Sequence, residues 1–272
     1  MKMRMLAVAA VASLSFGTAN AAVQQIFEVN GVTPGDIEDT VNDFRDALGP
    51  NNGNAPVNGN RFGRRQIDWD AAPDGVSDPN LFPGDFFNAD VAPRARGIEF
   101  RATGTTDSFQ LSSTAASGEP VRFGAPGQFT AFSEERLFTP VNGNTFDVVF
   151  FDPSNQTRQA TTRGLGIVFT DVEFDVTTMT FFDINDEEIF TRTVLSGPSA
   201  SLSFLGVVFD SFEVARVSVS VGQGFFDGSN FPVDGVVMDD FIFGEPVAVP
   251  VPGAALLFAA PLAALARRKC SA

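Results

Sequence analysis

The chain has 272 residues, with 33 Asp or Glu, 18 Lys or Arg, one Cys, and neither His nor Tyr. The lack of His excludes Ser-His-Asp catalysis, Cys-His catalysis and imidazole metal sites, and Cys270 alone can form no internal disulfide or thiolate zinc site. Residues 22–246 carry all the acids and a net charge of −20, which repels nucleic acid, so no nucleic-acid partner is expected.

Residues 1–21 have the parts of a secretory signal peptide. A basic start is followed by an apolar stretch over 6–16, and Ala19 and Ala21 supply the small residues of a cleavage site. The apolar stretch is too short to span a bilayer. We therefore expect signal peptidase to cut after Ala21 and the remaining chain to be exported.

Residues 22–94 are expected to form a helix and long loops that pack on the β-structure that follows. Thr33 can cap the start of a helix, Pro34 suits its first position, and Gly49 with Pro50 ends it. In between, apolar residues recur every three or four positions, at Ile37, Val41, Phe44 and Leu48. The pattern predicts a helix over 34–48. The Asn-, Gly-, Pro- and Asp-rich stretch after it, 49–93, predicts either a long ordered loop or a strand with long turns.

This long loop, 49–93, carries three candidate features for ligand binding. Trp69 is either a core residue or a stacking platform for a sugar, and its two acidic neighbours favour the core. A basic group, Arg61, Arg64 and Arg65, could meet an acidic polysaccharide or offset nearby acids, and we favour the offset. Four acids, Asp68, Asp70, Asp74 and Asp78, could hold a cation, although a turn explains them better.

From residue 97 the chain reads as a series of short strands. Residues 216–221 alternate strictly, with valines on one face and polar side chains on the other. Similar runs, separated by turn residues, lie at 97–101, 108–112, 146–151, 166–169, 173–182, 188–194, 202–209 and 236–243. Eight or nine short strands without intervening helices predict an all-β fold over 95–246, an antiparallel β-sandwich of jelly-roll type.

Asp239 and Asp240, on the last of these strands, are the candidate metal ligands. Strand alternation places one carboxylate on each face of the sheet, and carboxylate oxygens are what Ca²⁺ prefers. The alternatives are exposure at an edge or pairing with an Arg. The acidic run at 183–188 is a fainter calcium loop that a hairpin turn explains better. Ca²⁺ is the one cofactor that the sequence suggests.

The C-terminal segment, 247–272, begins with twenty uncharged residues and then carries Arg267, Arg268 and Lys269. Its uninterrupted helical part, 253–266, is about 21 Å long at 1.5 Å per residue. That is short for a bilayer core of roughly 30 Å. We expect a C-terminal hydrophobic helix that anchors the chain transiently in the membrane, with a permanent anchor or a buried core helix as alternatives.

The motif Val249-Pro250-Val251-Pro252-Gly253, the apolar helix and the basic end resemble the PEP-CTERM class of bacterial sorting signals, in its VPLPA-type variant. Val251 stands where the main type has Glu. The resemblance implies cleavage within the motif by an exosortase-type protease, followed by release or attachment in the cell envelope or exopolysaccharide matrix. The stretch 236–244 is also similar to the last strand of jelly-roll modules found in such proteins, a fold they share with carbohydrate-binding modules.

The expected function is that of an exported, non-enzymatic protein with a structural or adhesive role in the cell envelope or biofilm matrix. Extracellular polysaccharide is the expected partner beyond the two processing proteases. The first alternative is a calcium-dependent carbohydrate-binding module. A glycoside hydrolase is less favoured, because it needs two carboxylates about 5–10 Å apart in a cleft and no motif singles out such a pair.

Overall fold

The computed structural model describes residues 22–113, 123, 125, 127–226 and 234–249. The predicted signal peptide, the C-terminal hydrophobic helix and the sorting motif from Pro250 onward lie outside these residues. Within the described ranges, no helix is long and apolar enough to cross a membrane.

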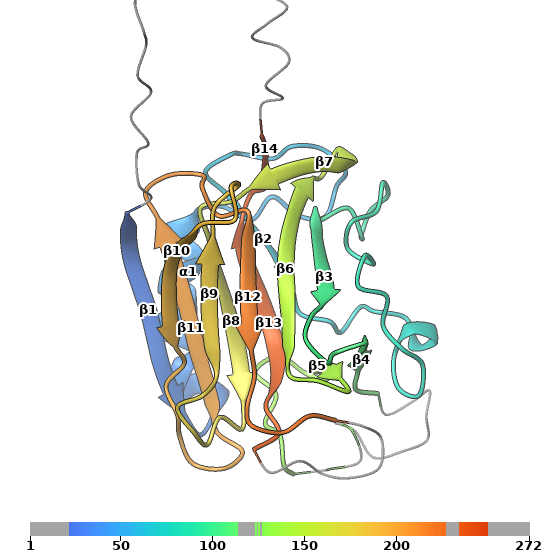
Figure 1. The fold of residues 1–272 in the computed structure, drawn as a ribbon, viewed down its shortest axis with the longest axis vertical. Helices are drawn as coiled ribbons and strands as arrows, with labels where there is room; N and C mark the ends of the chain where they lie inside the picture. The colour runs from blue at the N-terminus through green and yellow to red at the C-terminus, as the bar shows by residue number, and fades with distance from the viewer. Residues whose placement is uncertain (1–21, 114–122, 124, 126, 227–233, 250–272) are drawn as a thin grey trace, which may run out of the picture.

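The described chain folds as an all-β sandwich of two seven-stranded sheets with antiparallel pairing (Figure 1). Sheet 1 has the order β1-β11-β8-β13-β5-β4, with β2 also paired to β13. Its strands are β1 (Val23–Gly31), β2 (Arg64–Ile67), β4 (Ser108–Leu111), β5 (Phe138–Val141), β8 (Gly164–Thr170), β11 (Leu202–Phe209) and β13 (Val237–Gly244).

Sheet 2 has the order β10-β9-β12-β6-β7-β14, with β3 also paired to β6. Its strands are β3 (Ile98–Ala102), β6 (Thr145–Asp152), β7 (Asn155–Thr161), β9 (Thr178–Phe182), β10 (Glu188–Thr193), β12 (Arg216–Ser220) and β14 (Val247–Ala248). The main hydrophobic core lies between the sheets, and the alternation predicted for β12 holds, because Val217 and Val219 are buried in this core.

Each of the nine predicted strand runs contains an observed strand, although in 173–182 only 178–182 is extended. Five further strands lie outside these runs: β1, β2, β5, β7 and β14. β2 falls within 49–93, where a strand with long turns was the alternative to a loop, and β1 falls where no strand was expected. The five strands lack the apolar alternation of a half-buried strand; β7, for example, reads Asn-Gln-Thr-Arg-Gln-Ala-Thr and is mostly exposed.

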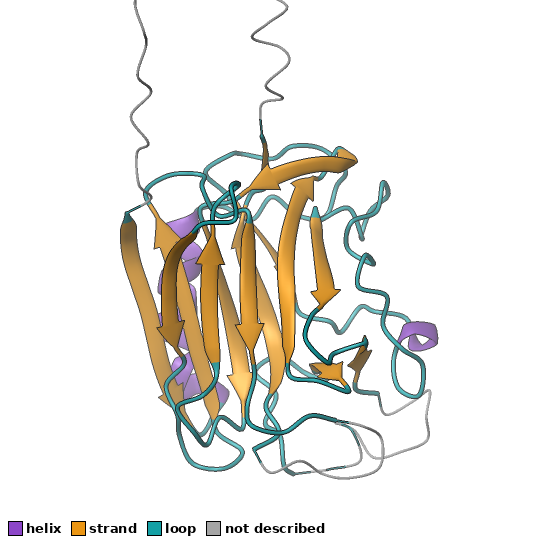
Figure 2. Cartoon of the chain, in the orientation of Figure 1, coloured by secondary structure: helices purple, strands orange, loops and turns teal. Residues whose placement is uncertain are grey.

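The predicted helix is confirmed as α1 (Pro34–Leu48), which lies along the outer face of sheet 1 (Figure 2). Its first turn is held by Asp36, whose carboxylate accepts hydrogen bonds from the backbone N–H and the hydroxyl of Thr33, both at 2.8 Å. Its four buried apolar residues are those that the sequence pattern placed on one face. They pack on β8, β11 and β13 in a second hydrophobic cluster.

The covering by α1 explains the composition of the central strands of sheet 1. Every residue of β8, β11 and β13 is buried, because one face meets sheet 2 and the other meets the helix or a loop. Such strands read as continuous apolar runs rather than as alternating ones. The ring of Phe44 lies over a facing pair of glycines, Gly166 and Gly206, whose missing side chains leave room for it.

Candidate functional site

A cleft of about 370 Å³ lies in the loop between β2 and β3, and all its lining residues come from positions 68–96. The same loop contains a short 3-10 helix, η1 (Asp74–Val76), visible beside the sandwich in Figure 2. The volume lies within the range of small-molecule sites, which are mostly apolar with a few fixed polar groups. This cleft has that composition.

Trp69 lines the cleft although it is only 1% exposed. Its ring stacks on Phe138 with a centroid distance of 4.6 Å and an interplanar angle of 3°. Its Nε1 donates a hydrogen bond to the backbone carbonyl of Asp239 at 2.6 Å. The preference for Trp69 as a core residue is therefore confirmed, although its edge also lines the cleft.

Two aromatic–arginine pairs line the cleft. The guanidinium of Arg94 lies 5.0 Å from the ring centroid of Phe86, and that of Arg96 lies 4.6 Å from the centroid of Phe87. The two rings are themselves in edge contact at 5.0 Å. Cation–π contacts of this kind attract a guanidinium to the face of a ring and limit its motion.

Three charged groups in the cleft, on Asp68, Arg94 and Arg96, have polar atoms without a hydrogen-bond partner in the described chain. Arg96 is 6% exposed; its Nε donates to the Pro93 carbonyl at 3.1 Å and its Nη1 donates to the Gln66 carbonyl, while its Nη2 has no partner among the described residues. Burial lowers the pKa of Arg96 to about 10, so it remains charged at neutral pH. Within the described chain, neither the Asp68 carboxylate nor the Arg94 guanidinium takes part in a hydrogen bond or ion pair, although the charge of Asp68 raises the pKa of Arg96 against the effect of burial.

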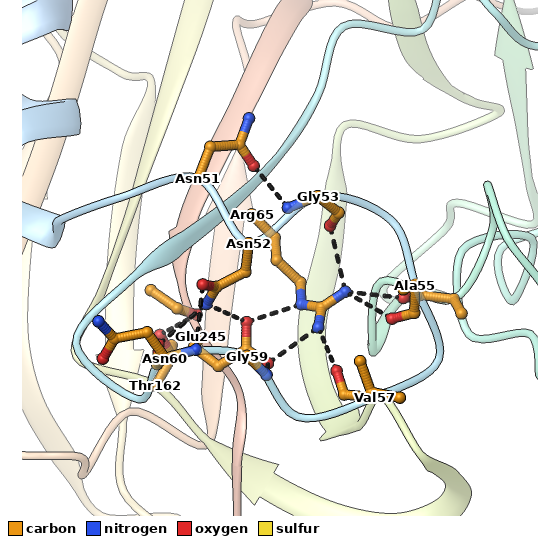
Figure 3. Close-up of polar contacts among 12 residues, drawn as sticks. Asn51, Asn52, Gly53, Ala55, Val57, Gly59, Asn60, Arg65, Thr162 and Glu245 are labelled. Atoms are coloured by element: carbon orange, nitrogen blue, oxygen red, sulfur yellow. Dashed lines mark hydrogen bonds and ion pairs between the residues drawn. The ribbon is translucent and has the colours of Figure 1, made fainter.

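Arg65, from the predicted basic group, is a fully buried structural residue rather than a ligand site (Figure 3). Its guanidinium pairs with both carboxylate oxygens of Glu245, at 2.7 and 2.9 Å. The remaining donors reach backbone carbonyls, among them Val57 at 2.7 Å and Ala95 at 2.9 Å. Glu245 also accepts hydrogen bonds from Asn52 and from the backbone of Gly59, so the pair ties the loop over 52–59 to the end of β13.

The other two members of the basic group behave differently. Arg64 donates from Nη1 to the Gly49 carbonyl at the end of α1. Arg61 stacks on Phe212 and Phe62, with its guanidinium carbon 4.5 and 5.4 Å from the two centroids. The expectation that the group offsets nearby acids is confirmed for Arg65 alone.

Asp239 and Asp240 lie together, but not as an open pair of cation ligands. A β-bulge between Met238 and Phe241 breaks the alternation, and both carboxylates contact the Ser133 hydroxyl, at 3.0 and 2.8 Å. The expectation of one carboxylate on each face is therefore wrong. Asp239 also accepts the N–H groups of Phe132 and Ser133, and Asp240 accepts Nη2 of Arg45 at 2.8 Å.

Burial is the main cause that raises the pKa of both carboxyl groups, and for Asp239 the charge of Asp240 adds to it. The two residues are 0% and 2% exposed. Because N–H donors and a guanidinium already take their oxygens, these residues as arranged do not fit a Ca²⁺ ion, which needs six to eight oxygen ligands. No group of three or more acidic, Cys or His residues arranged for a metal occurs in the described ranges.

The remaining acidic candidates are turn and loop residues. Asp183 accepts the N–H groups of Asn185 and Glu187, at 2.8 and 2.9 Å, as the hairpin reading of 183–188 predicts. The four loop acids do not converge on one point. Asp70 accepts the backbone N–H of Arg136 at 2.9 Å, and Asp74 pairs with the guanidinium of the same Arg136. Asp78 accepts a hydrogen bond from the Gln110 side chain. Of the four acids, only Asp68 lines the cleft.

Phe86, Phe87, Arg94 and Arg96 were not predicted as site residues from the sequence. A signal was present, because two arginines one residue apart follow a Phe-Phe pair in a segment that is otherwise acidic. Nothing in the sequence shows that the four side chains meet, since the loop that joins them has no periodic pattern.

No family model matches the chain, and no curated protein matches it. Among solved structures, a fucose-binding module of Streptococcus pneumoniae, SpX-3, is similar to 49% of this chain and to 93% of its own length. The identity is 12% and the TM-score is 0.19. At that TM-score the likeness carries no conclusion about the fold or the ligand of this chain.

Proposed function

We propose that this chain is an exported, non-enzymatic protein whose β-sandwich binds polysaccharide in the cell envelope or extracellular matrix through the cleft at 68–96. One observation carries the proposal. An aromatic cleft of about 370 Å³ contains one carboxylate and two guanidinium groups. In the described chain, the Asp68 carboxylate, the Arg94 guanidinium and Nη2 of Arg96 have no hydrogen-bond partner. Sugars need this combination, because their rings offer apolar C–H faces and their hydroxyls need fixed polar partners.

The strand order supports a jelly-roll topology for the sandwich. Four strands of sheet 1, in the order β5-β13-β8-β11, face four strands of sheet 2, in the order β6-β12-β9-β10. Taken along the chain, these eight strands alternate between the sheets except at the β9–β10 hairpin. The jelly roll is a double-sheet fold of eight strands used by lectin domains among others, but a fold alone does not assign a function.

The arrangement of acids favours binding over hydrolysis. Among the residues that line the cleft, Asp68 is the one carboxylate, whereas glycoside hydrolysis uses two that flank the bond to be broken. The close pair Asp239 and Asp240 is buried and bonded to Ser133 and Arg45, so a substrate has no access to it.

Export and sorting rest on the two terminal signals. The last described residues support such processing: β14 pairs with β7, and the Val249 N–H donates to the Gln159 carbonyl at 3.0 Å. An exosortase-type cut beyond Val249 would therefore leave every described strand in place, as would signal peptidase cutting after Ala21. The chain would be held at the membrane only until that second cut.

The proposal is tested by screening the full chain for binding to neutral and acidic polysaccharides, with and without EDTA. The affinities of the Phe86→Ala and Phe62→Ala variants for a bound polysaccharide are then compared. Both rings carry an Arg over one face, at 5.0 and 5.4 Å, but only Phe86 lines the cleft. We expect at least one polysaccharide to bind and Phe86→Ala to weaken that binding about threefold to tenfold, the effect of losing one aromatic contact.

Phe62→Ala is expected to leave the affinity unchanged. An absence of binding to every polysaccharide, or equal effects of the two substitutions, would contradict the proposal. Binding that disappears with EDTA would favour the calcium-dependent module instead, and release of new reducing ends would favour a hydrolase.

A further inference from the structure

Resting on the proposed function, we propose that the cleft recognises a carboxylated sugar, that is, a uronate residue of an acidic polysaccharide. The two guanidinium groups of Arg94 and Arg96 would bind the sugar carboxylate, Asp68 would accept a hydroxyl of the same residue, and the Phe86 ring would meet the apolar face of the sugar.

The charge of the cleft is the first feature that favours a carboxylated sugar. Residues 22–246 have a net charge of −20, yet the cleft is lined by two guanidinium groups and one carboxylate. Seven arginines elsewhere in the described chain each lie within 3.4 Å of a carboxylate. Neither Arg94 nor Arg96 has such a partner among the described residues, although the charge of Asp68 acts on Arg96. The two arginines and Asp68 therefore leave the cleft with one net positive charge that no other described lining residue balances.

The way in which Arg94 and Arg96 are held is the second feature that favours a carboxylated sugar. Arg96 is held in place by two backbone carbonyls and by the Phe87 ring, which leaves Nη2 as its one uncommitted nitrogen. The guanidinium carbon of Arg94 lies 5.0 Å from the centroid of the Phe86 ring, and the centroids of the Phe86 and Phe87 rings are 5.0 Å apart. Guanidinium groups fixed in this way suit the planar, two-oxygen shape of a carboxylate better than a flexible ammonium would.

Asp68 is the third feature, because it favours a uronate over anions that carry more negative charge. A sugar carboxylate carries one negative charge, so the two arginines and Asp68 together balance it. A phosphate monoester carries up to two negative charges, more than the single net positive charge of the two arginines and Asp68 balances. A uronate also brings hydroxyl groups on the same ring, and these give the Asp68 carboxylate a donor that the described chain does not supply.

The test is a binding titration of the full chain with trimers of galacturonate, glucuronate and mannuronate, each compared with its methyl ester. Esterification removes the charge and keeps the sugar ring. Short trimers at about 0.15 M salt limit the repulsion between the acidic surface and a long polyanion, because charges beyond roughly 8 Å are then screened. We expect at least one free trimer to bind about tenfold or more tightly than its ester, as one charge-assisted hydrogen bond predicts.

The matched variants are Arg94→Gln and Arg101→Gln. Both arginines lie over a Phe ring, but Arg101 on β3 is paired with Glu99 and lies outside the cleft lining. Arg94→Gln is expected to reduce the preference for the free acid to within about threefold, Arg94→Lys to restore part of it, and Arg101→Gln to leave it unchanged.

Equal binding of acid and ester, with a loss in Phe86→Ala, would overturn the uronate inference and leave the polysaccharide proposal standing. The same holds if only neutral glycans bind and Phe86→Ala weakens them. A chain that binds no glycan of either kind would overturn both. A preference for the acid that Arg94→Gln does not change would place the anion elsewhere and also overturn the inference.

Discussion

Replacing Gly166 by Ala tests how α1 is seated on sheet 1. Gly166 on β8 and Gly206 on β11 face each other in register, and the ring of Phe44 lies over both. A methyl group at Gly166 would lie 2.6 Å from Cε1 of Phe44 and 2.8 Å from Cζ of Phe204. Carbon atoms in good contact are roughly 3.5–4.0 Å apart, so the rings or the helix would have to move by about 1 Å.

The sign of the effect decides between two accounts. Where the backbone tolerates Ala, Gly→Ala stabilises a protein by about 0.4–1 kcal/mol because the unfolded chain loses freedom. Overpacking a filled core costs about 1–3 kcal/mol, and Phe44 is fully buried. We therefore expect Gly166→Ala to lower the free energy of unfolding by about 1–2 kcal/mol, the difference of these two effects.

Urea denaturation followed by the fluorescence of Trp69, the single Trp, measures this change. The control is Gly35→Ala at the start of α1, where a methyl group would meet nothing closer than 4.0 Å, and there we expect no loss of stability. Adding Phe44→Leu to Gly166→Ala should cost less than the sum of the two single changes, since the shorter side chain relieves the clash. A Gly166→Ala protein as stable as the wild type would refute this account of the packing.

Two further predictions concern buried charge. Arg65→Met should destabilise the protein by about 3–5 kcal/mol, because it leaves Glu245 buried without its partner, and Arg65→Met with Glu245→Leu should recover part of the loss in the same assay. An Arg65→Met protein with an unchanged urea midpoint would contradict the role of this pair. The pKa values of Asp239 and Asp240 are raised in the folded state, which therefore holds protons that the unfolded state has lost. The contribution of these two carboxyl groups to stability should fall as pH rises from 3.8 through the raised pKa values. Urea midpoints from pH 4 to 8 should show this slope, and Asp239→Asn should flatten it; an equal or steeper slope in Asp239→Asn would count against burial as its cause.

The local sequence pattern was sufficient to predict the helices and strands whose apolar residues recur with a regular spacing. The four apolar positions of α1, its capping residues and the glycine after it are within sixteen positions of one another, so the helix could be predicted with its observed bounds. The same is true of β12, where valines alternate with polar residues. The sandwich followed from the number of such runs.

The strands that escaped prediction owe their structure to their partners. β1 is an edge strand with a mixed exposure pattern, and it becomes a strand by pairing with β11 over most of its length. β2 has four residues, Arg-Arg-Gln-Ile, and pairs with the end of β13. Backbone pairing does not depend on side-chain type, so a polar or short segment can form a strand without a pattern that reveals it.

The sequence by itself determined the excluded chemistries, the amphipathic helix and most of the sandwich strands, because composition and short-range periodicity act within a few residues. Only the tertiary structure decided that a bulge turns Asp239 and Asp240 toward Ser133, and that Asp68, Phe86, Arg94 and Arg96 line one cleft. These outcomes depend on contacts between segments far apart in the chain or within an aperiodic loop. There, burial and the choice of hydrogen-bond partner follow from how the whole chain packs.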